Sequence, residues 1–426
     1  MRLRDLHPNI RLRIVVGFVQ RFLAIMLTPL MVIHLASRYG PAVTGVLMTV
    51  VACAGIVAPL VGGHLADTWG RRPVLLLGEG AAAVLFAALA AVNRPPSDSA
   101  FLTYLFYLAL VFLTAMAIPA ADAVMVDVST PESRQAMYAF NYWSINVAFT
   151  LGALVGPFFY GEHFFGLLVA GAVLSTLTLL VIFRWIVETK PTPDLPSVTG
   201  IAAVLRGYLS LSTDRGFLRQ LLAAVLIASI ELQIVYYIAV RLAGEFGSQH
   251  LVELGSWSPT VDGIQMLGIL RATNAALVVV LTLGVALVAR HASHREQLVG
   301  GLLAFIGGYM VWAVSNVGWV LLLAALVLTM GEVVSVPVRQ SLLANSVPAH
   351  ARTRYLAVYG LNFRVGLLVA GICVTLGAVA PAGVMAGLYA ALGALAVWLY
   401  VPLLPRRAVG RHRRPSPIPL TTGVVT

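Results

Sequence analysis

The residues most able to do chemistry in this sequence are carboxylates that interrupt long apolar stretches. Glu332 lies near the middle of the run 318–345, in "MGEVVSVP", and Glu231 lies midway along the run 217–242. An ionisable side chain within a lipid-spanning helix costs about 2.5–3.5 kcal/mol on insertion scales, so such a residue marks a functional site. Desolvation favours the neutral carboxyl, which suits a group that exchanges protons near neutral pH. We predict that Glu332 and Glu231 bind protons and cationic substrate, with a hydrogen-bonded structural glutamate as the alternative for Glu332.

Asp122 and Arg339 stand at equivalent positions in two similar parts of the chain. The segment "STPESRQAMY" matches "SVPAHARTRY", which places Pro131 over Pro348. In the same register Asp122 falls over Arg339, at the same separation of 217 residues. Their opposite charges predict an ion pair between two halves of the protein that closes an inner gate.

Three more charged residues fall inside apolar runs. Arg21 and Arg364 lie about two and a half helical turns inside their runs. They are candidates to neutralise Asp122, Asp127 or a substrate anion, and snorkelling to the membrane surface is the alternative. For Glu79 we expect a snorkelled acid, with a position against the nearby arginine pair as the alternative.

These residues must be positioned by membrane-spanning helices, because the chain is far too apolar for a soluble protein. Of its 426 residues 59% are hydrophobic and 11% are charged, and the mean hydropathy is +0.90; soluble domains have about 25% charged residues. A spanning helix needs roughly 20 apolar residues. Twelve runs meet this need: 13–37, 41–62, 72–93, 101–127, 134–160, 164–187, 217–242, 263–289, 297–315, 318–345, 354–379 and 383–403. The sequence predicts an all-α integral membrane protein with twelve transmembrane helices.

The distribution of basic residues predicts the orientation of these helices. Only Arg38, Arg94 and Arg241 fall in connections on the side opposite the termini. Because basic loops remain in the cytoplasm, we expect a multi-pass protein of the inner (cytoplasmic) cell membrane with both termini inside. The proline-rich connection after the sixth run predicts a six-helix bundle over 1–187, a linker over 188–216, a second bundle over 217–405 and a basic tail over 406–426.

The composition also excludes several classes of function. The net charge of +11 is dispersed in short clusters without interleaved aromatic residues, which favours contact with anionic lipid over nucleic acid. There is no phosphate-binding glycine-rich loop and no metal-ligand cluster of His and Cys. We therefore expect no enzyme, cofactor or metal, and energy from a proton gradient.

The stretch "GGHLADTWGRRPVLLLG" carries the most specific motif, at Gly63, Leu65, Ala66, Asp67, Gly70, Arg71 and Arg72. It resembles the signature loop between the second and third helices of the major facilitator superfamily. The resemblance implies two six-helix bundles related by pseudo-two-fold symmetry, and a loop that locks the outward-facing state. Asp67 is expected to pair with the arginines and to accept hydrogen bonds from a neighbouring helix N-terminus.

Two further resemblances point to the proton-coupled multidrug antiporters of that superfamily. "LGALVGPFFYG" is similar to their fifth-helix motif at Gly152, Gly156 and Pro157, with generic glycine packing as the alternative. "MVDVSTPESR", "NYWSINVAFTLG" and "TMGEVVSVP" resemble segments whose acids, here Asp127 and Glu332 together with Asp67, handle protons and cationic drugs. Asn141 replaces an aspartate of that group, and capping the following loop is the alternative for Asp127. Nearby aromatic residues are candidate ligands for organic cations: Phe140, Tyr142, Trp143, Tyr236 and Tyr237.

We predict a monomeric transporter that works by alternating access, with protons, a small-molecule substrate and the lipid bilayer as its partners. The leading expectation is export of amphipathic compounds by proton antiport. Import by proton symport is the alternative, because "QRF", "FNYWSIN" and "GEVVSVP" resemble segments of proton-coupled peptide transporters, although Gly17 and Gln20 stand where those carry acids. A lipid or lysolipid transporter and a non-transporting receptor are further alternatives.

Overall fold

The computed structural model describes residues 5–94, 97–189, 214–251, 260–289, 292–347, 355 and 358–404. Almost all of these residues are helical. The predicted basic tail and residues 190–213 of the predicted linker lie outside the described residues.

The first half of the chain forms long helices joined by short turns. Its elements are α1 (Pro8–Trp69), α2 (Arg71–Val92), β1 (Asn93–Arg94), β2 (Ser97–Asp98), α3 (Ala100–Met116), α4 (Ile118–Asp127) and α5 (Pro131–Trp185). α1 contains two predicted spans because the chain turns at Gly40, whose φ of 76° is readily adopted only by glycine. α5 also contains two, separated by a non-helical residue at His163.

The second half repeats this layout with more breaks. Its elements are α7 (Arg215–Glu231), the 3₁₀ turn η3 (Leu232–Ile234), α8 (Tyr237–Glu245), β3 (Gln249–His250), β4 (Thr260–Val261), α9 (Gly263–Ala289), α10 (His294–Val314), α11 (Gly318–Ser346), α13 (Leu361–Gly377), α14 (Ala382–Tyr400) and the 3₁₀ turn η5 (Val401–Leu403). β1 pairs with β2, and β3 with β4, in two antiparallel hairpins.

Helix starts follow local capping chemistry. At the start of α5, Thr130 and Ser133 form a capping box, and Ser293 and Glu296 form another at the start of α10. At α7, the Asp214 carboxylate accepts a hydrogen bond of 3.0 Å from the Phe217 N–H. These caps set where α5, α7 and α10 begin.

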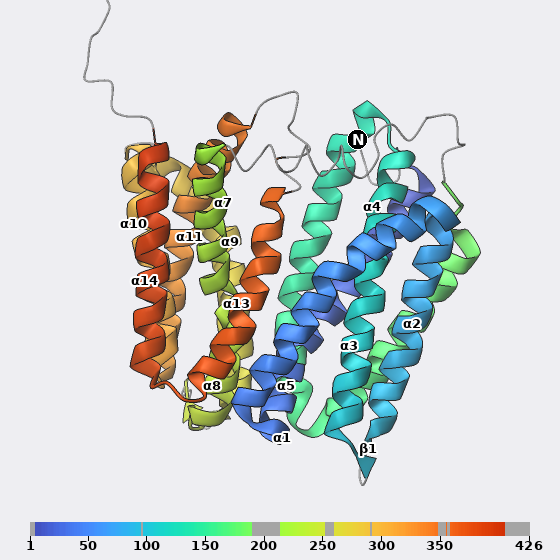
Figure 1. Ribbon diagram of the computed structural model, residues 1–426, viewed down its shortest axis with the longest axis horizontal. Helices are drawn as coiled ribbons and strands as arrows, with labels where there is room; N and C mark the ends of the chain where they lie inside the picture. Colours follow the sequence, from blue (N-terminus) through green and yellow to red (C-terminus); the bar gives the residue numbers. More distant parts are fainter. Residues whose placement is uncertain are drawn as a thin grey trace, which may run out of the picture.

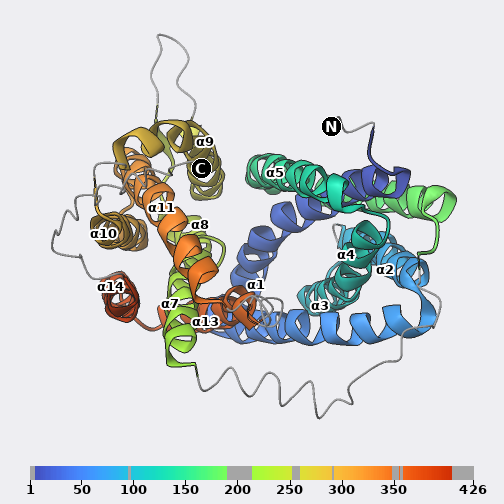
Figure 2. The ribbon, with the colours of Figure 1, turned by 90° about the horizontal axis from the view of Figure 1, so that it is seen from above.

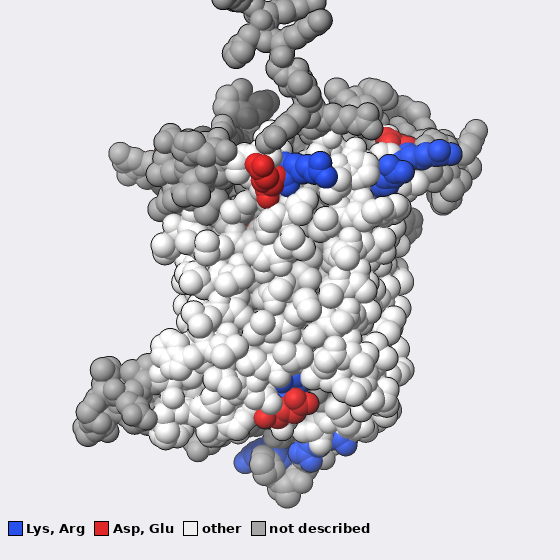
Figure 3. Space-filling view, turned by 90° about the vertical axis from the view of Figure 1, so that its left-hand side faces the viewer, with Lys and Arg blue, Asp and Glu red and all other residues white. Residues whose placement is uncertain are grey.

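The prediction of twelve transmembrane helices is confirmed. Ten helical segments of the described chain are long and apolar enough to cross a membrane. One of these is α1, which crosses twice, and Leu361–Gly377 adds a shorter apolar helix. In Figure 3 the described charged residues gather at the two ends of the molecule and leave an uncharged band between them, as a bilayer requires.

The helices form two bundles, α1 to α5 and α7 to α14, seen side by side in Figure 1 and from above in Figure 2. We name the two ends of the molecule by their elements: the N-terminal end, where α1 and α2 begin, and the β1 end. At the β1 end the bundles touch, since the Thr375 hydroxyl donates a hydrogen bond of 2.9 Å to the Ala42 carbonyl. A Cβ atom at Gly45 would lie 2.5 Å from the Thr375 nitrogen, so glycine allows this close approach.

The glycines of the fifth-helix motif lie against α1. A Cβ atom at Gly152 would lie 2.8 Å from the Phe22 carbonyl oxygen, and one at Gly156 would lie 2.8 Å from that of Met26. The next residue, Pro157, packs against Gly268 of the other bundle. Small residues therefore bring α1, α5 and α9 together around the space between the bundles.

Candidate functional site

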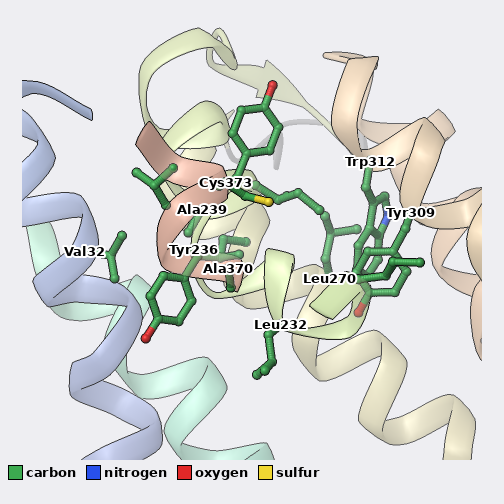
Figure 4. Packing of buried hydrophobic residues seen from close by; sticks show 14 of the residues in the cluster. Val32, Leu232, Tyr236, Ala239, Leu270, Tyr309, Trp312, Ala370 and Cys373 are labelled. Atoms are coloured by element: carbon green, nitrogen blue, oxygen red, sulfur yellow. The ribbon is translucent and has the colours of Figure 1, made fainter. Parts of the chain in front are cut away.

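A cavity of about 680 Å³ lies between the two bundles. Its walls are mostly apolar and include seven aromatic side chains: Phe86, Tyr107, Phe149, Tyr236, Tyr309, Trp312 and Phe363. Figure 4 shows Tyr236 reaching from the second bundle to the neighbourhood of Val32 on α1. The lining extends to Arg13 and Met125, close to the start of α1 and the end of α4, so the cavity reaches the N-terminal end.

Eight Arg, Asp and Glu side chains line this cavity, and their formal charges sum to zero. Four are arginines and four are acids: Arg13, Arg21, Arg271, Arg364, Glu79, Asp122, Glu231 and Glu332. With all four carboxyl groups ionised, this set has no net charge. Each proton bound by a carboxyl group makes the cavity more positive by one unit.

Glu332 is half-buried on α11 and is held by an amide from α9. Asn274 Nδ2 donates to Glu332 Oε2 at 3.1 Å and to Thr329 Oγ1 at 2.9 Å. Thr329 precedes Glu332 by three residues, which puts both on one face of α11. The amide therefore orients the carboxylate.

Glu231 is the last residue of α7, immediately before the 3₁₀ turn η3. Its side chain is exposed to the cavity, and its backbone carbonyl accepts a hydrogen bond of 3.0 Å from the Tyr309 hydroxyl. Glu332 and Arg339 are the charges that act on it. A 3₁₀ segment inside a long helix is typical of a hinge, so this carboxylate sits where the helix can bend.

Arg271 has a role that the sequence did not assign. It is 4% exposed, and its guanidinium lies 5.2 Å from the centre of the Phe149 ring. Its Nη1 also donates to the Ile25 carbonyl at 3.4 Å, which joins α9 to α1 of the other bundle. Arg271 and Asn274 are three residues apart, and this helical spacing was the available signal that both face the cavity.

Glu79 corrects the sequence-based expectation of a snorkelled acid. Its side chain is 2% exposed, and it accepts hydrogen bonds from the Gln20 amide and the Thr178 hydroxyl. The donors come from α1 and α5. Sequence spacing alone did not show that Glu79 faces the interior of its bundle.

The signature loop forms a separate cluster at the N-terminal end. Arg71 Nη1 lies 3.3 Å from Asp67 Oδ1, and Arg71 Nε lies 3.4 Å from Asp127 Oδ2. The Thr189 hydroxyl donates to the same Asp127 oxygen at 3.0 Å. Asp127 thus joins the loop arginine at the end of α4 and is not among the residues that line the cavity.

A different acid from the one expected caps the start of α2. The Glu188 carboxylate accepts from the backbone N–H groups of Arg71 and Arg72, at 2.9 and 3.0 Å. Asp67 takes no part in this cap, and its side chain is 76% exposed. Gly70 has a φ of 108°, and a Cβ atom there would lie 2.6 Å from Glu188 Oε2, so glycine is required. At Gly63 the nearest atom to such a Cβ is 3.9 Å away, an ordinary contact.

The predicted gate residues lie on different bundles and do not meet in this conformation. The charges acting on Asp122 are Arg13 and Arg21 of its own bundle. Arg339 acts on Glu231 and Glu332 of the second bundle. Among the described residues no ion pair joins Asp122 to Arg339.

The remaining candidates also fall around the cavity. Asn141 is half-buried and lines it. Arg21 supplies one of the charges beside Asp122, and Arg364 Nη1 lies 3.3 Å from where a Cβ atom at Gly55 would be. Of the aromatic candidates with described side chains, Tyr236 lines the cavity, whereas Trp143 is exposed on the outer surface.

Comparison with known proteins identifies the family. Residues 14–371 match the family model of the Major Facilitator Superfamily. The chain belongs to this superfamily. Its members are transporters, and the relatives described next are transporters too.

Among curated relatives, this chain is similar to the Na⁺, Li⁺, K⁺/H⁺ antiporter of Planococcus maritimus. The two are 25% identical over 383 residues, which cover 88% of this chain and 90% of the antiporter. It is also 24% identical to the class C tetracycline resistance protein of Escherichia coli over 318 residues, 74% of this chain and 73% of that protein.

Solved structures of superfamily transporters share the fold. An auto-inhibited POT family peptide transporter superposes with a TM-score of 0.69 at 15% identity, covering 96% of this chain and 99% of that one. The nucleoside transporter NupG gives 0.67 at 13% identity, covering 93% and 99%. At these identities the likeness concerns the fold alone.

Proposed function

We propose that this superfamily transporter is a proton-coupled antiporter that exports amphipathic compounds across the cytoplasmic membrane by alternating access. The observation that carries the proposal is the placement of Glu231 and Glu332 in one mostly apolar cavity of about 680 Å³. An apolar cavity with a few placed charges suits a ligand with an apolar body and a polar or cationic group. Aromatic walls add attraction for an organic cation.

The charge balance of the cavity supports exchange of protons for substrate. With its carboxylates ionised the cavity offers negative partners for a cation beside Glu231 and Glu332. Protonation of these groups removes those partners and leaves the arginines in excess, which expels a cation. Substrate and protons therefore compete, and competition for one site is the requirement of antiport.

The conformation of the protein fits the inward-facing state of such a cycle. We propose, from the distribution of basic residues, that the N-terminal end lies in the cytoplasm. The cavity reaches this end, and the contact between Thr375 and Ala42 lies at the other. Closing the N-terminal end would bring Asp122 and Arg339 together, as the match between the two halves predicts.

Exchange of monovalent metal cations for protons is the second candidate. The curated antiporter relative that covers most of the chain is named for Na⁺, Li⁺ and K⁺. Glu231, Glu332 and Asn274 supply the oxygen ligands that hard cations prefer. The large apolar part of the cavity favours an organic substrate over a bare ion.

Transport in proteoliposomes with an imposed pH gradient tests the proposal. The panel is ethidium, tetracycline, a dipeptide and Na⁺. An antiporter accumulates its substrate in vesicles with an acidic interior, whatever its orientation, because protons leave as substrate enters. Accumulation in vesicles with an alkaline interior shows symport and contradicts the proposal.

Two substitutions separate the proton site from general damage. Glu332→Gln keeps the size and hydrogen bonding of the side chain and removes its titration, so gradient-driven accumulation should fall at least about tenfold, a change of about 1.4 kcal/mol. Glu245→Gln is the matched control, because Glu245 pairs with Arg241 at the β1 end, outside the cavity lining. Unchanged transport by Glu332→Gln contradicts the assignment of the site.

A further inference from the structure

We infer that Glu79, Gln20 and Thr178 form a proton-binding site in the first bundle, separate from the carboxylates of the second. Glu79 lines the cavity, is 2% exposed, and is hydrogen-bonded by side chains from α1 and α5. The proposed function uses Glu231 and Glu332 and gives this buried acid no task. Three helices supplying one carboxylate and two donors make a built site rather than a chance polar contact.

The hydroxyl of Thr178 can satisfy both protonation states of Glu79. In the ionised state the hydroxyl donates to Glu79 Oε2. Thr178 Oγ1 also lies 2.9 Å from the Ser175 carbonyl oxygen and 3.2 Å from the Leu174 carbonyl oxygen, which can accept its hydrogen. When a proton from cavity water binds Glu79 Oε2, the new carboxyl O–H donates to Thr178 Oγ1, and the Thr178 hydroxyl turns to donate to Ser175. No hydrogen-bonding group is left without a partner in either state.

Gln20 remains a donor throughout this exchange. Its amide N–H donates to Glu79 Oε1, the oxygen that does not take the proton. A metal cation held by both carboxylate oxygens would have to replace both of these hydrogen bonds, whereas a proton on Glu79 Oε2 changes only the one from Thr178. The arrangement therefore favours a proton as the ligand.

Arg13 is a buried positive charge whose balance changes when Glu79 binds a proton. It is 5% exposed and lines the cavity, and within the described chain its Nε and Nη1 are buried without a hydrogen-bond partner. The acids that act on it are Glu79 and Asp122. When Glu79 is neutralised, this desolvated guanidinium keeps only Asp122 as counter-charge, which is costly for a buried cation. Because Arg13 and Gln20 both belong to α1, proton binding at Glu79 acts on the position of that helix.

The surroundings of Glu79 contain few other titrating groups. Of the helices packed against α2, α1 brings Arg13 and Arg21, and α4 brings Asp122. α3 carries only Tyr104 and Tyr107 as titratable residues, and residues 172–183 of α5 carry none. Among the described residues of this bundle that line the cavity, Asp122 is the one acid besides Glu79, so it is the main competitor for a spectroscopic change assigned to Glu79.

Infrared difference spectroscopy on the full-length protein in lipid tests this site without knowledge of the substrate. Spectra at acid and alkaline pH, in H₂O and D₂O, report the C=O stretching band of protonated carboxyl groups. One band should disappear in Glu79→Gln and persist in Asp122→Asn, Glu231→Gln and Glu332→Gln. A spectrum of Glu79→Gln identical to that of the unmodified protein would overturn the inference.

A second pair of variants protects the test against misfolding of Glu79→Gln. Thr178→Val removes the hydroxyl at nearly constant volume, so the Glu79 band should remain and move to higher frequency. Thr176→Val is the matched control, since its hydroxyl bonds to the Ala172 carbonyl on the exposed face of the same helix. A band that is the same in both variants also overturns the inference. Failure of Glu332→Gln to affect transport would count against the proposed function and leave the Glu79 site standing.

Discussion

Asn274 on α9 donates a hydrogen bond of 3.1 Å to Glu332 on α11, and the same amide bonds to Thr329 one turn earlier. This relationship fixes the direction of the carboxylate and couples two helices of the second bundle. Any change in the protonation of Glu332 must alter the contact between α9 and α11. The amide is therefore the first place where proton binding can be converted into helix movement.

Replacing this amide should shift the pH dependence of transport. Asn274→Leu removes a hydrogen-bond donor to the carboxylate. Hydrogen bonds to charged groups contribute about 1.5 kcal/mol or more. The protonated form then persists to higher pH, so the limb of the profile that depends on Glu332 should move upward by about one pH unit. Initial rates of gradient-driven transport across a pH series measure this. Asn345→Leu, on the exposed end of α11, should leave the profile in place.

The gate hypothesis predicts reciprocal rescue. Asp122→Asn alone and Arg339→Gln alone should each reduce transport, because each leaves a charge without its partner when the N-terminal end closes. The exchange Asp122→Arg with Arg339→Asp should restore part of the activity. Crosslinking of Asp122→Cys to Arg339→Cys, with Cys53 and Cys373 replaced by serine, should increase when substrate drives closure. Absence of both rescue and crosslinking contradicts the pairing.

The Glu188 cap predicts a stability difference between two loop acids. Glu188→Ala leaves two N–H groups at the start of α2 without their carboxylate, and lost caps cost about 0.5–2 kcal/mol. Asp67→Asn changes an exposed group and should cost less. Thermal unfolding in detergent should give a lower midpoint for Glu188→Ala than for Asp67→Asn. Equal midpoints would show that the cap contributes nothing.

The close contact at the β1 end predicts a variant biased toward the opposite conformation. At Gly45 a Cβ atom would collide with the backbone of Thr375, so Gly45→Val should push the bundles apart at this end. In this background a cavity cysteine, Tyr236→Cys, should become reactive to membrane-impermeant thiol reagents added outside. Gly80→Val is the control, because nothing lies within 4 Å of a Cβ atom there. Equal labelling in both variants argues that the contact is no seal.

Much of the fold was predictable because bilayer thickness imposes a length on each span. The predicted runs 72–93 and 318–345 differ from α2 (Arg71–Val92) and α11 (Gly318–Ser346) by at most one residue at each end. Hydrophobicity predicts which segments span the bilayer. It does not say which neighbour a helix face meets, so the contact of Glu79 with Gln20 and Thr178 was missed.

The cap on α2 shows a second limit of sequence reasoning. The signature loop pointed to Asp67, the acid that stands within the motif itself. The residue that caps the helix, Glu188, is more than a hundred positions later in the chain. No local spacing predicts such a pairing. By contrast, the three-residue spacing of Arg271 and Asn274 could have predicted that both face the cavity.

The balance of four arginines and four acids around the cavity has an electrical consequence. When the cavity is empty and deprotonated it has no net charge, so the carrier moves no net charge across the bilayer as it reorients. The proton-loaded form carries positive charge and must move it through the membrane field, at about 2.3 kcal/mol per unit charge for each 100 mV. Voltage should therefore act on the proton-loaded step and leave the step that carries an uncharged substrate unaffected. With a cationic substrate both steps carry positive charge, so the membrane potential would act on the two halves of the cycle in opposite directions.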